Sequence, residues 1–163
     1  MKKITLFIFL FIIFITKVNA SYIVFDQDNL SVIYGDNIHE KRLIASITKV
    51  MSAYVVIKNS NLEDVVIIGD EVNKAHGSSI YLKKGEEIKV RDLLYGMLLR
   101  SGNDASISLA TYVAGSEENF VNLMNNEVRN LGLKNTIFQN STGLDEEGHF
   151  VNKRIMCRHG AGI

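Results

Sequence analysis

A serine and a lysine lie three residues apart in the stretch Ala45-Ser46-Ile47-Thr48-Lys49. Positions i and i+3 share one face of an α-helix, so the Ser46 hydroxyl and the Lys49 amine are expected within hydrogen-bond reach of each other. A serine hydroxyl is a weak nucleophile at its own pKa and needs a base, which a desolvated lysine can supply. The pair predicts nucleophilic catalysis. The alternative from the same residues is a helix N-cap followed by a solvated lysine.

A helix is predicted to carry this pair. Apolar residues recur after Ser46 at the spacing i, i+3, i+4, i+7, i+8, which is typical of a buried helical stripe. They are Ile47, Val50, Met51, Tyr54 and Val55. Ser46 is expected in the first turn, where unpaired backbone N–H groups and the helix dipole stabilise negative charge that develops on a nucleophile.

A second polar segment, LLRSGNDAS at residues 98–106, interrupts two helical patterns. Such a break puts polar side chains on a short turn between packed helices, from which Ser101 and Asn103 are expected to reach into a cleft. A Ser-x-x-Lys nucleophile motif combined with a Ser-x-Asn turn is the signature set of the active-site-serine penicillin-recognising enzymes.

Three longer stretches extend this match: GSSI at 77–80, DLLYGMLLRSGNDA at 92–105 and FQNSTGLDEEGH at 138–149. Through them the chain, from about residue 22 to 150, resembles the D-alanyl-D-alanine carboxypeptidases, which are low-molecular-weight penicillin-binding proteins. The resemblance implies an α+β fold of the β-lactamase/transpeptidase-like type. We therefore expect an antiparallel sheet with helices on both sides and a helical subdomain, with the helix of Ser46 packed against the sheet.

The resemblance also implies a serine-type D-Ala-D-Ala carboxypeptidase that acts on peptidoglycan stem peptides in cell-wall maturation. Ser46 would attack the penultimate carbonyl to form an acyl-enzyme, with Lys49 as general base. Ser101 would relay a proton to the leaving amine, and Asn103 would position Lys49 or the substrate amide. Ser46, Ser101 and Asn103 are the expected substrate-binding residues. The implied partners are a stem peptide ending in D-Ala-D-Ala and β-lactams as inhibitors, with no metal or organic cofactor.

The chain departs from this family pattern near its end. The family's Lys-Thr-Gly motif belongs well beyond His149, and the sequence contains no Lys-Thr-Gly. We expect residues 21–150 to be the N-terminal part of a carboxypeptidase domain, and residues 151–163 to be an unrelated basic tail that results from a frameshift or early termination. The fold is then expected to be incomplete at its C-terminus, without the second oxyanion donor and the cation that binds the substrate carboxylate.

The N-terminus has the form of a secretory signal over residues 1–20. Lys2 and Lys3 precede an apolar run, and Val18-Asn19-Ala20 suits cleavage after Ala20. The alternative is an uncleaved N-terminal anchor. We expect an exported protein at the extracytoplasmic face of a bacterial membrane, in the cell wall or periplasm. Any membrane attachment would come only from the signal or from a lost C-terminal anchor.

Composition excludes several other classes of protein. Without Lys2, Lys3 and Lys17 the processed chain carries 15 basic against 18 acidic residues, so no nucleic-acid-binding patch is expected. A single cysteine, Cys157, excludes an internal disulfide and a Cys-rich zinc site. The four histidines have no metal-ligand spacing. About 140 residues suffice for one domain with a core.

The remaining pattern predicts strands, turns and helices around the two motifs. The β-rich runs at 22–26 and 30–34 flank Gln27-Asp28-Asn29 and predict a hairpin, and 65–68 predicts a short strand. Two apolar helical faces follow. Their members are Val90, Leu93, Leu94, Met97 and Leu98 for the first, and Phe120, Leu123, Met124, Glu127, Val128 and Leu131 for the second. Ser116 is the predicted N-cap of the second helix and Gly132 its stop.

Three hypotheses remain open from sequence. The first is an enzyme of D-Ala-D-Ala carboxypeptidase descent. The second is a class A-like β-lactamase, against which the Ser-Gly-Asn turn and its carboxypeptidase-like surroundings argue. The third is an inactive fragment or a non-catalytic module that binds penicillin or peptidoglycan.

Overall fold

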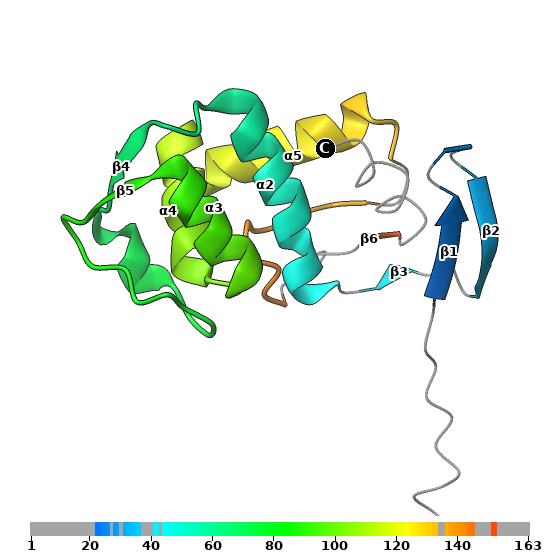
Figure 1. Ribbon diagram of the computed structural model, residues 1–163, viewed down its shortest axis with the longest axis horizontal. Coiled ribbons are helices and arrows are strands. Elements are labelled where there is room, and N and C mark those ends of the chain that lie inside the picture. Colours follow the sequence, from blue (N-terminus) through cyan, green and yellow to red (C-terminus); the bar gives the residue numbers. More distant parts are fainter. Residues whose placement is uncertain are drawn as a thin grey trace, which may run out of the picture.

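A computed structural model of the chain describes residues 22–26, 28–29, 31–36, 41–42, 44–133, 136–145 and 151–152 (Figure 1). The signal sequence predicted for residues 1–20 lies outside the described residues, as does the predicted tail beyond residue 152. Within the described part, helices and antiparallel strand pairs occur together, so the predicted α+β class is confirmed.

The predicted N-terminal hairpin is present. Strands β1 (Tyr22–Asp26) and β2 (Ser31–Asp36) pair antiparallel, with a register shift between Val24 and Phe25 that marks a bulge. The Asp26 carboxylate accepts hydrogen bonds from the backbone N–H groups of Asp28 (2.9 Å) and Asn29 (3.1 Å), and these bonds close the turn. Those bonds and one from the Asn29 side chain hold the pKa of Asp26 below its ordinary value.

The described strands do not join into one sheet. Strand β3 (Lys41–Arg42) pairs with β6 (Val151–Asn152), and β4 (Val65–Ile67) pairs with β5 (Glu87–Lys89), so three separate antiparallel pairs are present. In Figure 1 the β1–β2 hairpin stands apart from the helices, at the right-hand side. Among the described residues α2 (Thr48–Asn59) contacts other helices, and its packing against a sheet begun by the hairpin stays a prediction.

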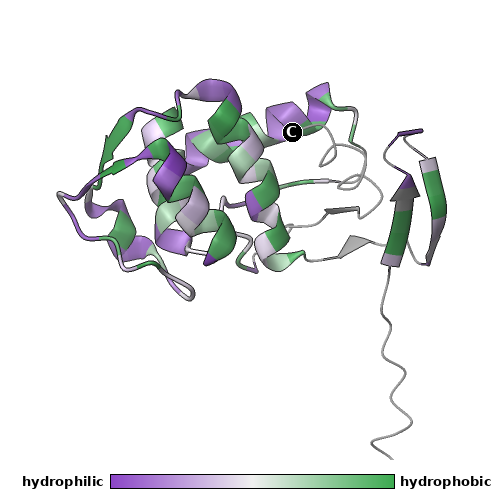
Figure 2. Ribbon diagram, in the orientation of Figure 1, coloured by the Kyte–Doolittle hydropathy of each residue, from purple (hydrophilic) through white to green (hydrophobic). Residues whose placement is uncertain are grey.

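Helices make up most of the described chain. Their bounds are η1 (Ala45–Ile47), α2 (Thr48–Asn59), η2 (Asp70–Lys74), α3 (Val90–Leu99), α4 (Asn103–Ala114) and α5 (Glu117–Asn130). Helix α4 is central, since it contacts α2, α3, α5 and η2 and its residues 103–110 are all buried. The fully buried apolar side chains come from several of these helices, and Figure 2 shows hydrophobic and hydrophilic residues distributed around each of them.

The apolar stripe predicted after Ser46 is only partly right. Met51 and Val55 are buried as expected, but Ile47 is 52% exposed and Val50 is 38% exposed. The buried face of α2 instead includes polar residues, among them Lys49 and Ser52. These polar side chains find backbone carbonyl partners, which removes most of the cost of burying them. An apolar periodicity cannot detect such a face.

The other two predicted helical faces are largely confirmed. Val90, Leu93, Leu94 and Met97 of α3 are buried, whereas Leu98 is 47% exposed. In α5 the Ser116 hydroxyl accepts a hydrogen bond from the Asn119 N–H (3.1 Å), which confirms the predicted N-cap. The helix ends at Asn130, and Gly132 has the positive φ (+65°) that suits the predicted stop.

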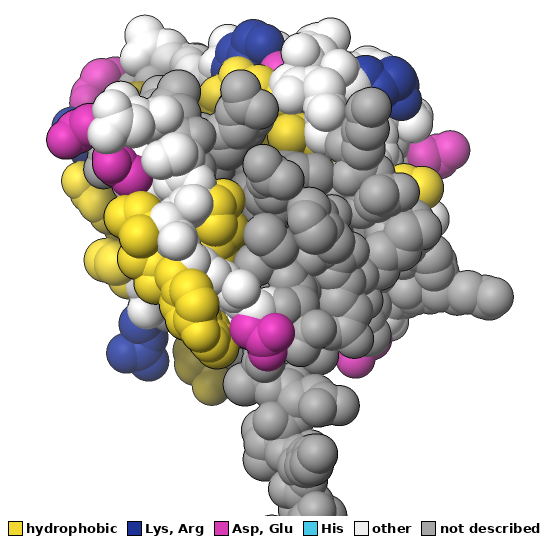
Figure 3. All heavy atoms as spheres, turned by 90° about the vertical axis from the view of Figure 1, so that its right-hand side faces the viewer, with side chains coloured by type: hydrophobic (Ala, Val, Ile, Leu, Met, Phe, Trp, Pro, Cys, Tyr) yellow, Lys and Arg dark blue, Asp and Glu magenta, His cyan; other side chains and the backbone are white. Residues whose placement is uncertain are grey.

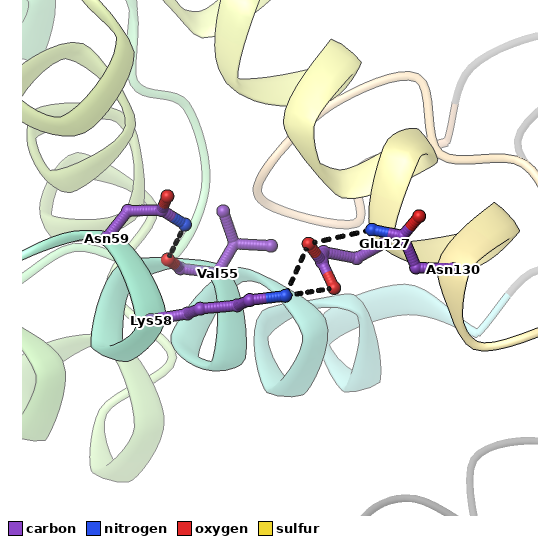
Figure 4. Close-up of polar contacts among 5 residues, drawn as sticks. All are labelled: Val55, Lys58, Asn59, Glu127 and Asn130. Carbon is purple, nitrogen blue, oxygen red and sulfur yellow. Dashed lines mark hydrogen bonds and ion pairs between the residues drawn. The ribbon is translucent and has the colours of Figure 1, made fainter.

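The polar exception in the α5 stripe has a partner on α2. Glu127 is nearly buried, and both of its carboxylate oxygens accept from the Lys58 ammonium, at 2.8 and 2.9 Å (Figure 4). These hydrogen bonds are the main reason that the pKa of Lys58 is raised. The ion pair ties the last turn of α2 to α5 and so holds the helix that follows Ser46.

Some apolar surface remains exposed. The exposed apolar side chains of the hairpin are Tyr22, Val24, Ile33 and Tyr34. Hydrophobic side chains form a band on the face of the molecule shown in Figure 3, which is the right-hand side of Figure 1. In the part of the chain that the structure describes, no helix has both the length and the apolar character needed to cross a bilayer.

Candidate active site

Ser46 lies in a tight 3₁₀ turn just before α2. The turn is held by hydrogen bonds from the Ile47 N–H to the Ile44 carbonyl (3.1 Å) and from the Thr48 N–H to the Ala45 carbonyl. Ala45 has a φ of +45°, a left-handed conformation that prevents a regular α-helix from starting earlier. The prediction that Ser46 sits in the first α-helical turn is therefore wrong by this one short turn. The side chain of Ser46 remains exposed.

Ser46 is paired with the first residue of the second motif. The Ser101 hydroxyl donates a hydrogen bond to the Ser46 Oγ at 2.8 Å, across 55 positions of sequence. Ser101 itself has a φ of +56° in the turn between α3 and α4. The N–H groups of Arg100 and Gly102 both donate to the Gly96 carbonyl at 3.2 Å, which closes this turn and aims Ser101 at the nucleophile candidate.

Lys49 is one of the most buried side chains in the described chain, with only 2% exposure. Its ammonium nitrogen donates to the Asn103 Oδ1 at 2.7 Å and to the Thr142 carbonyl at 2.6 Å. Burial lowers the pKa of Lys49 from 10.5 to about 8. A neutral amine has two N–H donors and one lone pair, so these two acceptors satisfy the neutral form and leave its lone pair available for a proton.

No hydrogen bond joins Ser46 directly to Lys49 among the described residues. Ser46 belongs to the 3₁₀ turn and Lys49 to the first turn of α2, and the approach of their two side chains stays a prediction. The structure brings the four predicted residues together as two bonded pairs instead. These pairs are Ser46 with Ser101 and Lys49 with Asn103, and each joins the start of α2 to the α3–α4 turn or the start of α4.

Asn103 is fixed in one orientation. Its backbone N–H donates to the Ser78 carbonyl (2.8 Å), and its side-chain Nδ2 donates to the His76 carbonyl (2.5 Å). A flipped amide would set its oxygen against the His76 oxygen and its NH₂ against the Lys49 amine, so the acceptor oxygen must face Lys49. The side chain is buried, and its position depends on the loop before β5.

That loop is held by a buried carboxylate beside the site. Asp104 accepts hydrogen bonds from the Ser79 hydroxyl (2.5 Å) and from the N–H groups of Ile80 (3.1 Å) and Leu82 (3.0 Å). Burial works to raise the pKa of Asp104, but these hydrogen bonds outweigh it and the pKa lies below its ordinary value. Asp104 thereby fixes the segment whose carbonyls orient Asn103.

Three contributors to this site were missed from sequence. The carbonyls of His76 and Thr142 act through the backbone, so no side-chain pattern could have identified them. Asp104 did offer a signal, since it follows Asn103 directly and is an acidic residue in the first turn of a helix. Among the residues that the structure describes, no group of three or more His, Cys, Asp or Glu side chains could hold a metal ion.

Comparison with known proteins bears on the identity of this arrangement. A family model described as D-alanyl-D-alanine carboxypeptidase matches residues 16–161. The chain belongs to this carboxypeptidase family. The match spans both serine motifs and the loop that contains Thr142.

Individual family members agree with this assignment. The chain is 39% identical over 142 residues to the D-alanyl-D-alanine carboxypeptidase DacF of Bacillus subtilis, covering 84% of this chain and 36% of that protein. It is 41% identical over 154 residues to DacC of Escherichia coli, covering 88% and 38%. The chain thus spans little more than a third of the length of these curated relatives.

Solved structures of the family share the fold. The carboxypeptidase DacD from Francisella tularensis superposes with a TM-score of 0.83 at 30% identity, covering 90% of this chain and 37% of that one. Penicillin-binding protein 5 from Haemophilus influenzae gives 0.82 at 32% identity, covering 90% and 45%. These likenesses confirm the transpeptidase-like fold predicted for the part of the family domain that this chain contains.

Proposed function

We propose that the chain carries the nucleophile, the base and the proton relay of a serine-type D-Ala-D-Ala carboxypeptidase. The observation that carries the proposal is the bonding of Lys49, which is buried, has a pKa of about 8 and makes the two hydrogen bonds that suit a neutral amine. A lysine in a structural role at the surface would keep a pKa near 10.5 and would be protonated at neutral pH.

In the proposed acylation step, the Ser46 Oγ attacks the penultimate D-Ala carbonyl of a peptidoglycan stem peptide. Lys49 accepts the hydroxyl proton and returns it to Ser101 as Ser101, which donates to Ser46 at 2.8 Å, gives its own hydroxyl proton to the leaving amine of the terminal D-Ala. The C–N bond breaks as the ester to Ser46 forms. Asn103 keeps Lys49 in place through its 2.7 Å hydrogen bond.

In the proposed deacylation step, water attacks the Ser46 ester, and Ser46 recovers its proton as the shortened peptide leaves. A β-lactam would acylate the same oxygen by opening of its ring amide, which makes it an inhibitor where hydrolysis is slow. Because the substrate is peptidoglycan, the proposed location is the extracytoplasmic side of a bacterial membrane, reached through the signal sequence predicted at residues 1–20.

Stabilisation of the oxyanion is the part of the mechanism for which these 163 residues supply the fewest groups. The family's Lys-Thr-Gly motif does not occur in the sequence. The second oxyanion donor and the cation for the substrate carboxylate are expected from that motif, and losing one oxyanion donor typically costs about 10²–10³ in rate. We therefore expect these residues alone to acylate slowly and to turn over poorly.

Labelling with a fluorescent penicillin tests the proposal. The wild-type chain should acquire a covalent label over hours, Ser46→Ala should acquire none, and Lys49→Ala should label at least tenfold more slowly because the hydroxyl lacks its base. Ser60→Ala is the matched control, since Ser60 follows α2 and its hydroxyl donates to the Val56 carbonyl. A label that persists in Ser46→Ala, or its absence from the wild type, would overturn the assignment. Rapid loss of the label would instead indicate a β-lactamase.

A further inference from the structure

Gly143 lies against the residue that precedes the nucleophile. Its φ of +82° is in the left-handed region. A Cβ at this position would lie 2.5 Å from the Ala45 carbonyl carbon and 2.9 Å from the Thr48 Cβ, and it would overlap the Ala45 oxygen. Since real Cβ atoms do not approach backbone this closely, only glycine fits here without moving one of the two segments.

The contact falls on the strained part of the nucleophile turn. Ala45 has a φ of +45°, which a residue with a side chain adopts only when its surroundings impose it. Its carbonyl accepts the Thr48 N–H and simultaneously rests on Gly143. The Cα of Gly143, which carries no side chain, therefore packs directly against the turn that contains Ser46.

The loop that presents Gly143 is rigidly braced. The Asn140 side chain accepts from the Gly143 N–H (2.7 Å) and donates to the Leu144 carbonyl (2.9 Å), so it clamps the loop on both sides of the glycine. The Ser141 carbonyl accepts from both the Ser52 hydroxyl (2.7 Å) and the Ser106 hydroxyl (2.8 Å). These bonds anchor the loop to α2 and α4, so the exposed turn of Ser46 would yield first to an added side chain.

We propose that Gly143 is a positioning residue that sets the Ser46 hydroxyl against Ser101 by its close contact with Ala45. The neighbouring Thr142 carbonyl holds Lys49, so one loop positions both members of the catalytic pair. Positioning of Ser46 stands on geometry alone, and only its effect on acylation rests on the proposed function.

A disulfide equilibrium measures this positioning without any catalysis. The parent carries Ser46→Cys, Ser101→Cys and Cys157→Ser, so its only two thiols replace hydroxyls that lie 2.8 Å apart. Equilibration with a glutathione buffer gives the effective concentration of one thiol at the other. Adding Gly143→Ala is expected to lower this value at least tenfold. Gly85→Ala is the matched control, because Gly85 has a φ of +85° but nothing within 4 Å of an added Cβ.

A second variant covers the case in which Gly143→Ala does not fold, as judged by circular dichroism and the thermal midpoint. Asn140→Ala keeps the glycine but removes its brace, and is expected to lower the effective concentration at least threefold. The effective thiol concentration in Gly85→Ala is then compared with that in whichever of the two loop variants folds. Two values that agree within twofold would overturn the proposal.

Penicillin labelling of chains that retain Ser46 forms a separate arm. Gly143→Ala should slow acylation about 100-fold, because small displacements of a nucleophile cost that much. The midpoint of its pH profile should stay near 8, since the Lys49 contact with Thr142 persists. Absence of labelling in the wild type would refute the proposed function and would leave the thiol measurement valid.

Discussion

Replacing Asn103 with aspartate should switch Lys49 from a base to a permanent cation. The Asn103 Oδ1 accepts from the Lys49 amine at 2.7 Å, so Asn103→Asp would set a carboxylate oxygen at that distance in a buried site. A neighbouring opposite charge favours the protonated amine and raises the pKa of Lys49. The acceptor oxygen that faces Lys49 is retained, whereas the Nδ2 that donates to the His76 carbonyl is replaced by a second oxygen, so the variant adds a charge and loses that one hydrogen bond.

The expected magnitude follows from the neutral fraction of Lys49. With a pKa of about 8, about 10% of the amine is neutral at pH 7. If the carboxylate restores the pKa to its ordinary value of 10.5, the neutral fraction falls to about 0.03%. The rate of Ser46 acylation at pH 7 should therefore fall about 300-fold.

The assay is the rate of penicillin labelling from pH 6 to pH 10.5. The wild-type rate should rise with pH and level off above about 8, whereas the Asn103→Asp rate should still be rising at pH 10. Asn125→Asp is the matched control, because Asn125 also donates to one backbone carbonyl and accepts from one donor, both on Phe138. A midpoint that stays near 8 in Asn103→Asp, or that moves equally in the control, would refute the reasoning.

Three further outcomes are expected. Because the folded pKa of Lys49 lies below its unfolded value, the free energy of unfolding should increase by about 3 kcal/mol as pH rises from 8 to 10.5. Denaturant titrations at several pH values should show this increase. If Lys49→Met shows the same increase, the pH dependence belongs to another group. The depressed pKa of Asp104 stabilises the fold at neutral pH, and this contribution should be lost as pH falls through that pKa. Asp104→Asn should lower the free energy of unfolding by about 2–4 kcal/mol by leaving buried donors unpaired. An unchanged thermal midpoint in this variant would contradict the role of Asp104 in holding the loop. The 163 residues alone should release D-Ala from a diacyl-Lys-D-Ala-D-Ala peptide at least 100-fold more slowly than a relative that contains Lys-Thr-Gly; comparable turnover would show that another part of this chain completes the site.

The sequence was most informative where side chains carry the chemistry. Ser46, Lys49, Ser101 and Asn103 could be selected from their types and spacing, and the structure brings them together as two bonded pairs. It was least informative where the backbone acts. The carbonyl of Thr142 has no signature in the sequence, because every residue carries one.

Two errors of the fold prediction have a common physical origin. Apolar spacing placed Ile47 and Val50 in the core, yet both are exposed, because buried carbonyl partners allow polar residues to occupy the inner face of α2. The left-handed Ala45, which moves Ser46 out of the α-helix, lies against Gly143, almost a hundred positions away in the sequence. Contacts between residues so far apart in the sequence cannot be predicted from the spacing of neighbouring residues.

The most direct test of the central claim is to map the site of acylation in the unmodified chain. After incubation with benzylpenicillin, trypsin cleavage at Arg42 and Lys49 places Ser46 on peptide 43–49, whereas cleavage at Arg100 and Arg129 places Ser101 on peptide 101–129. Mass spectrometry should find one penicilloyl group, on Ser46 of peptide 43–49, formed with a pH midpoint near 8. An adduct on another peptide, or no adduct after prolonged incubation at pH 9, would contradict the account.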